Sequence, residues 1–266
     1  MDLLKRELAP VLPEAWAAID DEARRVLESN LAGRQVVDLD GPHGWGHSSA
    51  NLGRLELLRE EPVPDVHVGK RIVLPLIEFR IPIHLAIMEL DYIARGARDP
   101  EITRVIQAAE KAALMEDGAI FNGYAEGGIS GIIEASKHDP LRLPAPGSDP
   151  LPAILAARDV LRDSGVNGPY SIVAGPKTFT ALGAAAPDGY PTEKRAREIL
   201  GGSVVRTSAF EGLLVLSVRG GDFILTVGQD LAIGYAYQEK HTVELYLTES
   251  FTFRVVEPAA AVLLKP

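Results

Sequence analysis

Residues 219–266 decide the fold, and they read RGGDFILTVGQDLAIGYAYQEKHTVELYLTESFTFRVVEPAAAVLLKP. Three β-rich runs follow one another almost without interruption in this stretch, with short polar turns between them. The runs carry no recognisable pattern of catalytic residues. We therefore expect the chain to end in a sheet, and its function to lie in assembly rather than in catalysis.

Composition indicates a soluble globular protein. The chain has 266 residues, of which 46% are hydrophobic and 24% charged, enough for one large domain or two lobes. No apolar run has the length of a membrane span, and the first residues lack the features of a signal peptide. We therefore expect a cytoplasmic protein without a membrane partner.

Two further counts exclude classes of site. The chain has no cysteine, which rules out disulfides, thiolate metal sites and cysteine nucleophiles. Its formal net charge of −10 argues against a surface that binds phosphates, so we expect no nucleic-acid partner.

Apolar periodicity predicts two long helices upstream of the terminal sheet. The first begins at Pro13, which suits the first helical position, and ends at Gly33. The second, a spine helix, runs from Asp99, a potential N-cap, to about Tyr124. Their apolar stripes are Trp16, Ile19, Ala23, Val26 and Leu27 in the first, and Ile102, Val105, Ile106, Ala109, Ala113, Ile120 and Phe121 in the second. We expect a short strand over 34–38.

Alternation around 55–58 and 72–76 predicts a long β-hairpin within 52–85. An isolated hairpin is marginal in water, so we expect a neighbouring subunit to cover it. Residues 135–218 are predicted to form a mixed lobe, and the proline-rich segment 140–152 near its start is predicted to be a connection between lobes. The helices of the lobe are expected at 151–163, 177–182 and 192–200, and its strands at 170–174, 204–207 and 213–218.

The order of these parts resembles that of a tailed-phage major capsid protein. The local sequence motifs resemble those of the encapsulins, which are shell proteins of bacterial and archaeal nanocompartments. The matching segments are LKRELAP (4–10), AWxxIDxEAR (15–24), GRxxVDxxGPxGW (33–45), LPLIE (74–78), ELDxIxRG (89–96), EDxxIFxG (116–123), GPY (168–170), GYPxEKR (189–195), RGGDF (219–223), GQDLxIGY (228–235) and TExFTFxV (248–255). Each segment is weak alone, but together they cover nearly the whole chain in order.

The resemblance implies an α+β fold of the Hong Kong phage-like capsid type. The expected parts are an N-terminal helix with the first part of a peripheral domain (1–48), an extended hairpin arm (49–78), the peripheral domain with its spine helix (79–134), an axial lobe around a five-fold pore (135–218) and a peripheral-domain sheet (219–266).

The resemblance further implies a non-enzymatic subunit that assembles with itself into a closed icosahedral shell, expected to have sixty copies. Such shells enclose peroxidases or ferritin-like iron oxidases, with roles in oxidative stress and iron storage, through the C-terminal peptide of the cargo. Two alternatives are a prophage-type capsid protein that packages DNA and a protease or bacteriocin. The acidic balance disfavours the first, and the lack of a triad, metal cluster or thiol disfavours the second.

By motif match, the cargo peptide is expected in a groove between the N-terminal helix and the central sheet. The candidate residues are Leu27, Leu31, Arg34, Asp38, Asp230, Leu231, Ile233, Gly234 and Tyr235. An extended peptide with small apolar anchors needs an apolar trough and a few fixed polar groups, here Arg34 and Asp38. The alternative is that Arg34 and Asp38 form only an ion pair within the chain and that the apolar residues are core.

Two other sites follow from the resemblance. The loop around the five-fold pore corresponds to Ala184, Ala185, Ala186, Pro187, Asp188, Gly189 and Tyr190, where a ring of Asp188 carboxylates would favour cations. Some members of the family bind flavin through an aromatic residue, but Met88 stands in that place. We therefore predict no cofactor, although Arg80 is present nearby.

Other chemistry-bearing residues point to no site. His43 and His47 are four residues apart, but they lie in a glycine-rich loop rather than on a helix, without an acid of the H-E-x-x-H kind, so we expect no metal. The GGISG run at 127–131 fails the nucleophile pattern because Ile132 stands where the final glycine should be. We interpret the pair Glu116 and Asp117 as structural or as an inter-subunit polar contact.

Overall fold

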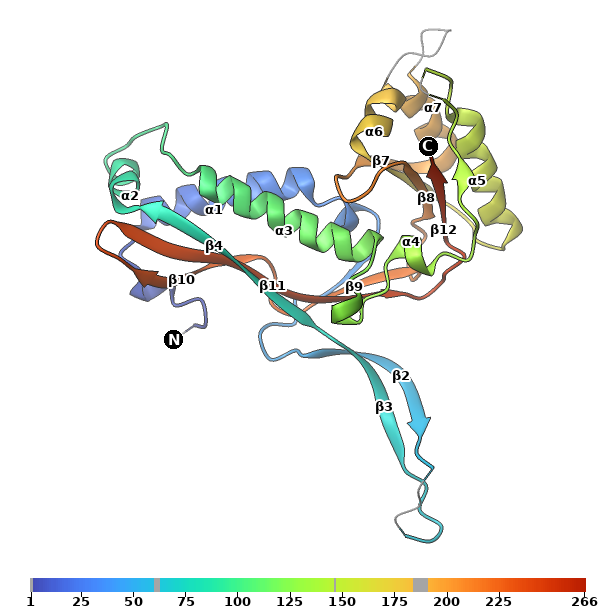
Figure 1. Cartoon of the computed structure of the whole chain (residues 1–266), viewed down its shortest axis with the longest axis horizontal. Helices are drawn as coiled ribbons and strands as arrows, with labels where there is room; N and C mark the ends of the chain where they lie inside the picture. Colours follow the sequence, from blue (N-terminus) through green and yellow to red (C-terminus); the bar gives the residue numbers. More distant parts are fainter. Residues whose placement is uncertain (1, 60–62, 146, 184–190) are drawn as a thin grey trace.

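In the computed structural model, which describes residues 2–59, 63–145, 147–183 and 191–266, most strands lie in two five-stranded sheets. A long body carries the first sheet, a lobe at one end carries the second, and a two-stranded hairpin projects from the body (Figure 1). No described helix is both long and apolar enough to cross a membrane.

The first sheet is organised around one long strand, β11. This strand pairs with β4 along one edge, and with β10 and then β9 along the other, while β1 extends the sheet in parallel beyond β9. The bounds are β1 Asp38–Asp40, β4 Ile77–Ala86, β9 Phe223–Val227, β10 Ala232–Gln238 and β11 Thr242–Val255. Residues 243–253 of β11 are buried almost without interruption, as expected of a strand covered on both faces.

Helices α1 (Pro13–Asn30) and α3 (Thr103–Phe121) lie along the sheet, and α2 (Ile87–Ala94) follows β4 at its far end (Figure 1). The apolar stripe of α1 packs into one cluster with α3 and β11, through residues such as Ile19, Val105 and Leu245. Small side chains on α3, all nearly inaccessible to solvent, permit close helix packing: Ala108, Ala109, Ala112 and Ala113.

The predicted start of the spine helix and the predicted end of the first helix need correction. The spine helix begins at Thr103, and Glu101 rather than Asp99 accepts a hydrogen bond from its first turn, from the amide of Thr103 at 3.2 Å. Helix α1 ends at Asn30, three residues before Gly33. Gly33 instead opens the short 3-10 turn η2 (Gly33–Gln35), so the predicted strand over 34–38 is wrong and β1 starts only at Asp38.

The lobe is built as predicted from alternating helices and strands. Helices α5 (Leu151–Asp163), α6 (Pro176–Gly183) and α7 (Thr192–Leu200) accompany the second sheet, whose order is β5-β12-β8-β6-β7. Its strands are β5 Leu141–Arg142, β6 Tyr170–Ala174, β7 Gly201–Arg206, β8 Leu213–Ser217 and β12 Ala261–Lys265. Three further short elements are η1 Arg6–Leu8, η3 Ala125–Gly127 and α4 Ile132–Ala135.

The last strand departs from the expectation that residues 219–266 form one sheet. Strand β12 pairs with β8 and β5 in the lobe, whereas β9, β10 and β11 lie in the body. The chain therefore returns to the lobe before it ends, which ties the two parts together. The predicted domain boundaries otherwise stay predictions.

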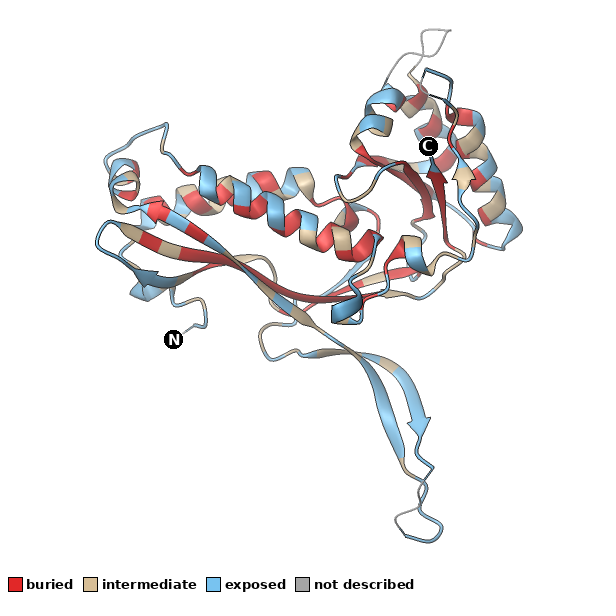
Figure 2. Cartoon of the chain, in the orientation of Figure 1, coloured by how far each residue is buried: buried red, intermediate tan, exposed pale blue. Residues whose placement is uncertain are grey.

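The hairpin arm consists of β2 (Ser49–Leu57) and β3 (Gly69–Pro75), so the hairpin prediction is confirmed, although residues 77–86 belong to β4 of the body. Most of the arm is exposed (Figure 2). Leu55 and Leu57 are 58% and 74% exposed, far more than leucines of a core.

Candidate functional site

A groove of about 490 Å³ runs between α1 and the start of β10. Its floor is apolar, because the buried lining residues Ala23, Leu31, Ile233 and Leu247 come from α1, the residue that follows it, and the first sheet. The other lining residues include six charged side chains. The lining residues are Arg6, Asp20, Ala23, Arg24, Leu27, Glu28, Leu31, Arg34, Asp230, Leu231, Ala232, Ile233 and Leu247. The groove therefore has the character of a binding site for an extended apolar segment.

Arg34 stands at one end of the groove, held by three carboxylates. Its Nη2 donates to Glu116 at 2.6 Å, Glu249 at 2.7 Å and Asp230 at 2.9 Å. Its Nε also donates to both oxygens of Glu116, at 3.0 and 2.9 Å. Burial opposes the charge of Arg34, but these bonds outweigh it and raise the pKa of the guanidinium.

Two of the three carboxylates are fully buried, because Glu116 and Glu249 are both 0% exposed. Burial, with the nearby charge of Glu116, raises the pKa of Glu249 well above its ordinary value, and Arg34 only partly offsets this. Oε2 of Glu249 is buried without a hydrogen-bond partner in the part of the chain described. Asp230 differs, because its side chain is 40% exposed and faces the groove.

Asp117, the neighbour of Glu116, joins three parts of the molecule. It accepts hydrogen bonds from the amides of Ala32 (3.2 Å) and Gly33 (2.8 Å) after α1, and from the hydroxyl of Thr207 (3.0 Å) beside the lobe. Burial raises its pKa to about 6, although these bonds oppose the shift. The pair Glu116 and Asp117 thus has a structural role, with all these partners in the same chain.

The structure brings six of the nine predicted groove residues together: Leu27, Leu31, Arg34, Asp230, Leu231 and Ile233. Asp38 lies elsewhere, because its carboxylate accepts the amide of Gly221 at the end of the first sheet. Arg34 is paired with Glu116, Glu249 and Asp230. The alternative interpretation, in which Arg34 and Asp38 form an ion pair within the chain, is not found among the ion pairs of the described residues.

The other two predicted residues support the groove from outside. Gly234 packs under the ring of Tyr246, where an added Cβ would meet Cζ at 2.5 Å. The amide of Tyr235 donates to the carbonyl of Leu4 at 2.8 Å, which fastens the N-terminal segment to β10.

Sequence reasoning missed the charged rim of the groove. Arg6 reaches it from η1, where it pairs with Asp20 at 2.6 Å and stacks 3.9 Å above the ring of Trp16. Asp20, Arg24 and Glu28 lie at helical spacing with Leu27, so the face of α1 that carries Leu27 could have revealed them.

Residues from the other predicted sites lie apart from the groove. Met88 is 60% exposed on α2 and accepts a contact from the hydroxyl of Tyr92, while Arg80 stacks on Tyr246. The predicted pore loop, 184–190, lies outside the described residues.

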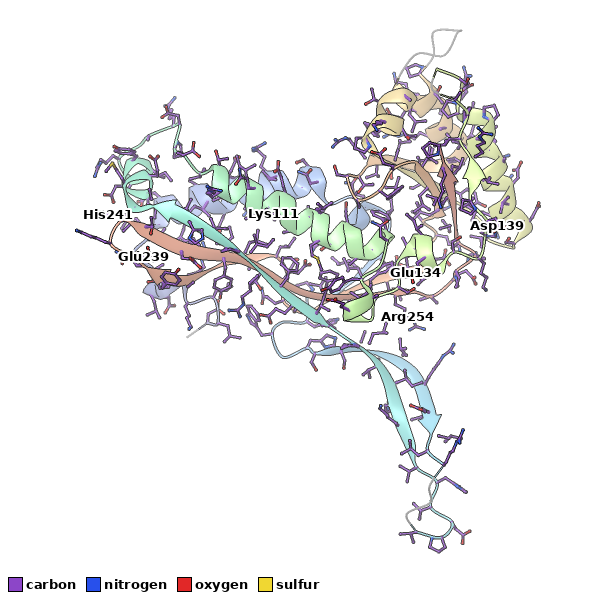
Figure 3. All side chains as sticks on the ribbon, viewed as in Figure 1. Lys111, Glu134, Asp139, Glu239, His241 and Arg254 are labelled. Carbon is purple, nitrogen blue, oxygen red and sulfur yellow. The ribbon has the colours of Figure 1, made fainter. Side chains whose placement is uncertain are left out.

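The two histidines of the glycine-rich loop form a local pair. His43 and His47 have ring centroids 4.5 Å apart, and His43 Nε2 lies 2.9 Å from Asp40. Charged side chains elsewhere are spread along the molecule, with Lys111 on α3 and Glu239 and His241 at the turn between β10 and β11 (Figure 3). Among the residues described, no group of three or more histidine, aspartate or glutamate side chains is arranged to hold a metal ion.

Comparison with known proteins gives the same family throughout the chain. A family model described as "Encapsulating protein for peroxidase" matches residues 1–252. The type 1 encapsulin shell protein of Rhodospirillum rubrum is 46% identical over 271 residues, which cover 100% of this chain and 97% of that protein. The type 1 encapsulin shell protein of Mycobacterium tuberculosis is 38% identical over 264 residues, 99% of each.

Solved structures confirm the capsid fold. The crystal structure of a virus-like particle from Pyrococcus furiosus has a TM-score of 0.70 at 16% identity, and the match covers 94% of this chain and 99% of that one. The capsid of Myoviridae phage XM1 has a TM-score of 0.59 at 13% identity, with 88% and 91% coverage. The chain belongs to the encapsulin family, and it is a shell protein that assembles in many copies into a capsid-like particle.

Proposed function

We propose that the shell built by this chain encloses a cargo protein whose C-terminal peptide docks in the groove between α1 and β10, and that the chain itself catalyses no reaction. The observation that carries the proposal is the groove, with its apolar floor and its fixed polar end. The family description names a peroxidase as what is enclosed, so a peroxidase is our first candidate for the cargo, ahead of a ferritin-like oxidase.

The groove is suited to a short extended segment. Its volume of about 490 Å³ holds several apolar side chains. Leu27 and Leu231 are partly exposed in it, so a docked peptide would remove further apolar surface from water. Three carboxylates already hold the Arg34 side chain in place. Binding of a peptide would therefore cost little conformational entropy at this side chain.

We propose further that the arm covers a neighbouring subunit and that sixty copies close the shell. Leu55 and Leu57 of β2 are exposed, and the two strands of the arm have almost no core of their own. Residues 184–190 remain our candidates for the five-fold pore.

A DNA-packaging capsid is the second candidate, since phage capsids share the fold. A net charge of −10 disfavours it, because packaged DNA needs a positive inner wall or counterions. Purified particles should therefore show the ultraviolet absorbance of protein without that of nucleic acid. Particles that carry nuclease-protected DNA and exclude a tagged cargo would support this candidate.

The test of docking is co-expression of the chain with a fluorescent protein that carries the C-terminal tail of a peroxidase encoded beside an encapsulin. Leu27→Gln should lower the fluorescence per particle severalfold and leave particles intact. Leu12→Gln is the matched control, since Leu12 is 56% exposed outside the groove. Equal loading of wild type and Leu27→Gln would refute this placement of the tail.

A further inference from the structure

Two buried glutamates meet at one guanidinium inside the body. Glu249 lies on β11 between Leu247 and Phe251, which point to the same face of the strand and are themselves buried. Glu116 reaches it from α3. Both glutamates are 0% exposed, and both accept a hydrogen bond from Nη2 of Arg34, at 2.7 and 2.6 Å. The two carboxyl groups therefore lie next to each other, away from water.

The guanidinium of Arg34 is shared unequally between these two acids. Glu116 accepts three hydrogen bonds from its Nε and Nη2, whereas Glu249 accepts one, through Oε1. The other oxygen of Glu249, Oε2, is buried and has no hydrogen-bond partner among the described residues. A buried carboxylate is costly unless its charge is paired and its oxygens are hydrogen-bonded. Glu249 is therefore the acid that this cluster suits least as a charged group.

The charged groups around this cluster bring no second cation to it. Asp230, from the loop before β10, adds a third carboxylate 2.9 Å from Arg34, and Asp117 follows Glu116 on α3. The remaining charged side chains that line the groove lie on η1 and α1: Arg6, Asp20, Arg24 and Glu28. Each of these two arginines is paired with an aspartate of α1. Within the described part of the chain, Arg34 is thus the single cation bonded to three acids.

The electrostatics agree with this geometry. Burial raises the pKa of Glu249 well above its ordinary value, and the nearby charge of Glu116 raises it further, while Arg34 opposes the shift. Glu116 also lies within hydrogen-bonding reach of Glu249. A neutral Glu249 can therefore donate its O–H to the charged Glu116.

We infer that Glu249 holds a proton in the folded chain, and that loss of this proton as the pH rises loosens the contact of η2 and α3 with the first sheet. With the proton in place, Arg34 faces the charges of Glu116 and Asp230 only. Without it, two adjacent buried carboxylates repel each other in a medium that screens them weakly. The side chain of Asp230 is 40% exposed, so water enters at this end of the cluster, between η2 and β10.

The variant Glu249→Gln tests the effect on stability. Glutamine has the shape of the neutral carboxyl and an N–H that can donate to Glu116, but it has no proton to lose. A carboxyl whose folded pKa is raised contributes stability that is present below the unfolded pKa and is lost as pH rises through the folded pKa. Particles of the variant should therefore melt with wild type in acid and above wild type at higher pH. The gap should grow by about 3 °C per pH unit between the two pKa values.

Glu239→Gln is the matched control, because Glu239 is an exposed glutamate between β10 and β11. Its melting temperature should follow that of wild type at every pH. Asp117, whose pKa is raised to about 6, titrates in all three proteins, so its contribution cancels in the differences between them.

Infrared spectroscopy detects the proton directly. Glutamates are isotope-labelled at the side-chain carboxyl, so that the carbonyl band of a neutral glutamate is separated from that of an aspartate such as Asp117. Wild-type particles should keep one neutral glutamate per subunit at a pH where exposed glutamates are charged. Glu249→Gln should lose this band, and Glu239→Gln should keep it.

Each measurement can overturn the inference. Wild-type particles without a neutral glutamate would refute it, and this result needs no variant to assemble. A band that persists in Glu249→Gln would place the proton elsewhere. A melting difference between Glu249→Gln and wild type that stays constant with pH would refute the loosening of the contact.

Discussion

Replacing Arg34 by methionine is the sharpest test of how the groove is held. Arg34→Met keeps a flexible apolar chain and removes the guanidinium, whose Nη2 lies 2.6 Å from Glu116 and 2.7 Å from Glu249. Both glutamates are 0% exposed, so neither can exchange the lost partner for water. Removing one side of a buried ion pair costs about 3–5 kcal/mol. At roughly 2 °C per kcal/mol for a chain of this size, the melting temperature should fall by about 6–10 °C.

The loss should depend on pH in a defined direction. Without Arg34, burial raises the pKa of Glu249 further above its unfolded value. A carboxyl whose folded pKa is raised contributes stability that is present below the unfolded pKa and is lost as pH rises through the folded pKa. The deficit of Arg34→Met should therefore be small at acidic pH near the unfolded pKa of a glutamate and should grow as the pH rises above it.

The assay is scanning fluorimetry of purified particles across this pH range. Arg24→Met is the matched control, because its pair with Asp21 is exposed, with side chains 63% and 73% accessible, and should contribute less than about 1 kcal/mol. Adding Glu116→Gln and Glu249→Gln to Arg34→Met should recover most of the loss, since no buried charge then remains. A deficit no larger than that of Arg24→Met, or one that does not change with pH, would refute the reasoning.

Three further outcomes are expected. The pKa of Asp117 is raised to about 6, so the stability that this carboxyl contributes is lost as pH rises from about 4 through about 6. The difference in unfolding free energy between wild type and Asp117→Asn should therefore shrink by roughly 3 kcal/mol over that range. Thermal melting at a series of pH values measures this difference. Gly131→Ala should lower the melting temperature sharply, since its Cβ would lie 2.2 Å from the amide nitrogen of Gly123, whereas Gly118→Ala on α3 meets nothing within 4 Å and should be neutral or stabilising. Replacing residues 56–70 by an Asn-Gly turn should leave the circular dichroism of the body intact and abolish particles on size-exclusion chromatography; normal particles would contradict the role of the arm.

Local patterns predicted the helices of the lobe well. The periodicity of 151–163 marks the bounds of α5 as observed, and Pro13 marks the start of α1, because amphipathic spacing and proline geometry depend only on neighbouring residues. Helix ends were predicted less well. Leu31 leaves the helix before Gly33 is reached, and the next turn is held by Asp117, a residue 84 positions beyond Gly33.

The residues of the candidate site were also predicted only in part from the sequence. Leu27, Leu31, Asp230, Leu231 and Ile233 were assigned by motif match to the family, and the structure gathers them around one groove. Asp38, only four residues from Arg34, is turned toward Gly221 because β1 pairs with β9. Asp38 therefore does not line the groove as predicted, and the alternative of an Arg34–Asp38 ion pair is not observed either.

The sequence by itself determined the family, the acidic and cysteine-free character, the amphipathic helices and the alternating arm, because each is written in residue type and short spacing. Only the tertiary structure decided the partners of Arg34, which lie 82, 196 and 215 residues away, and the return of β12 to the lobe sheet. The cluster of three carboxylates around Arg34 is a property of those long-range pairings. It exists only once α1, α3 and β11 have packed together and removed water from between their charged side chains.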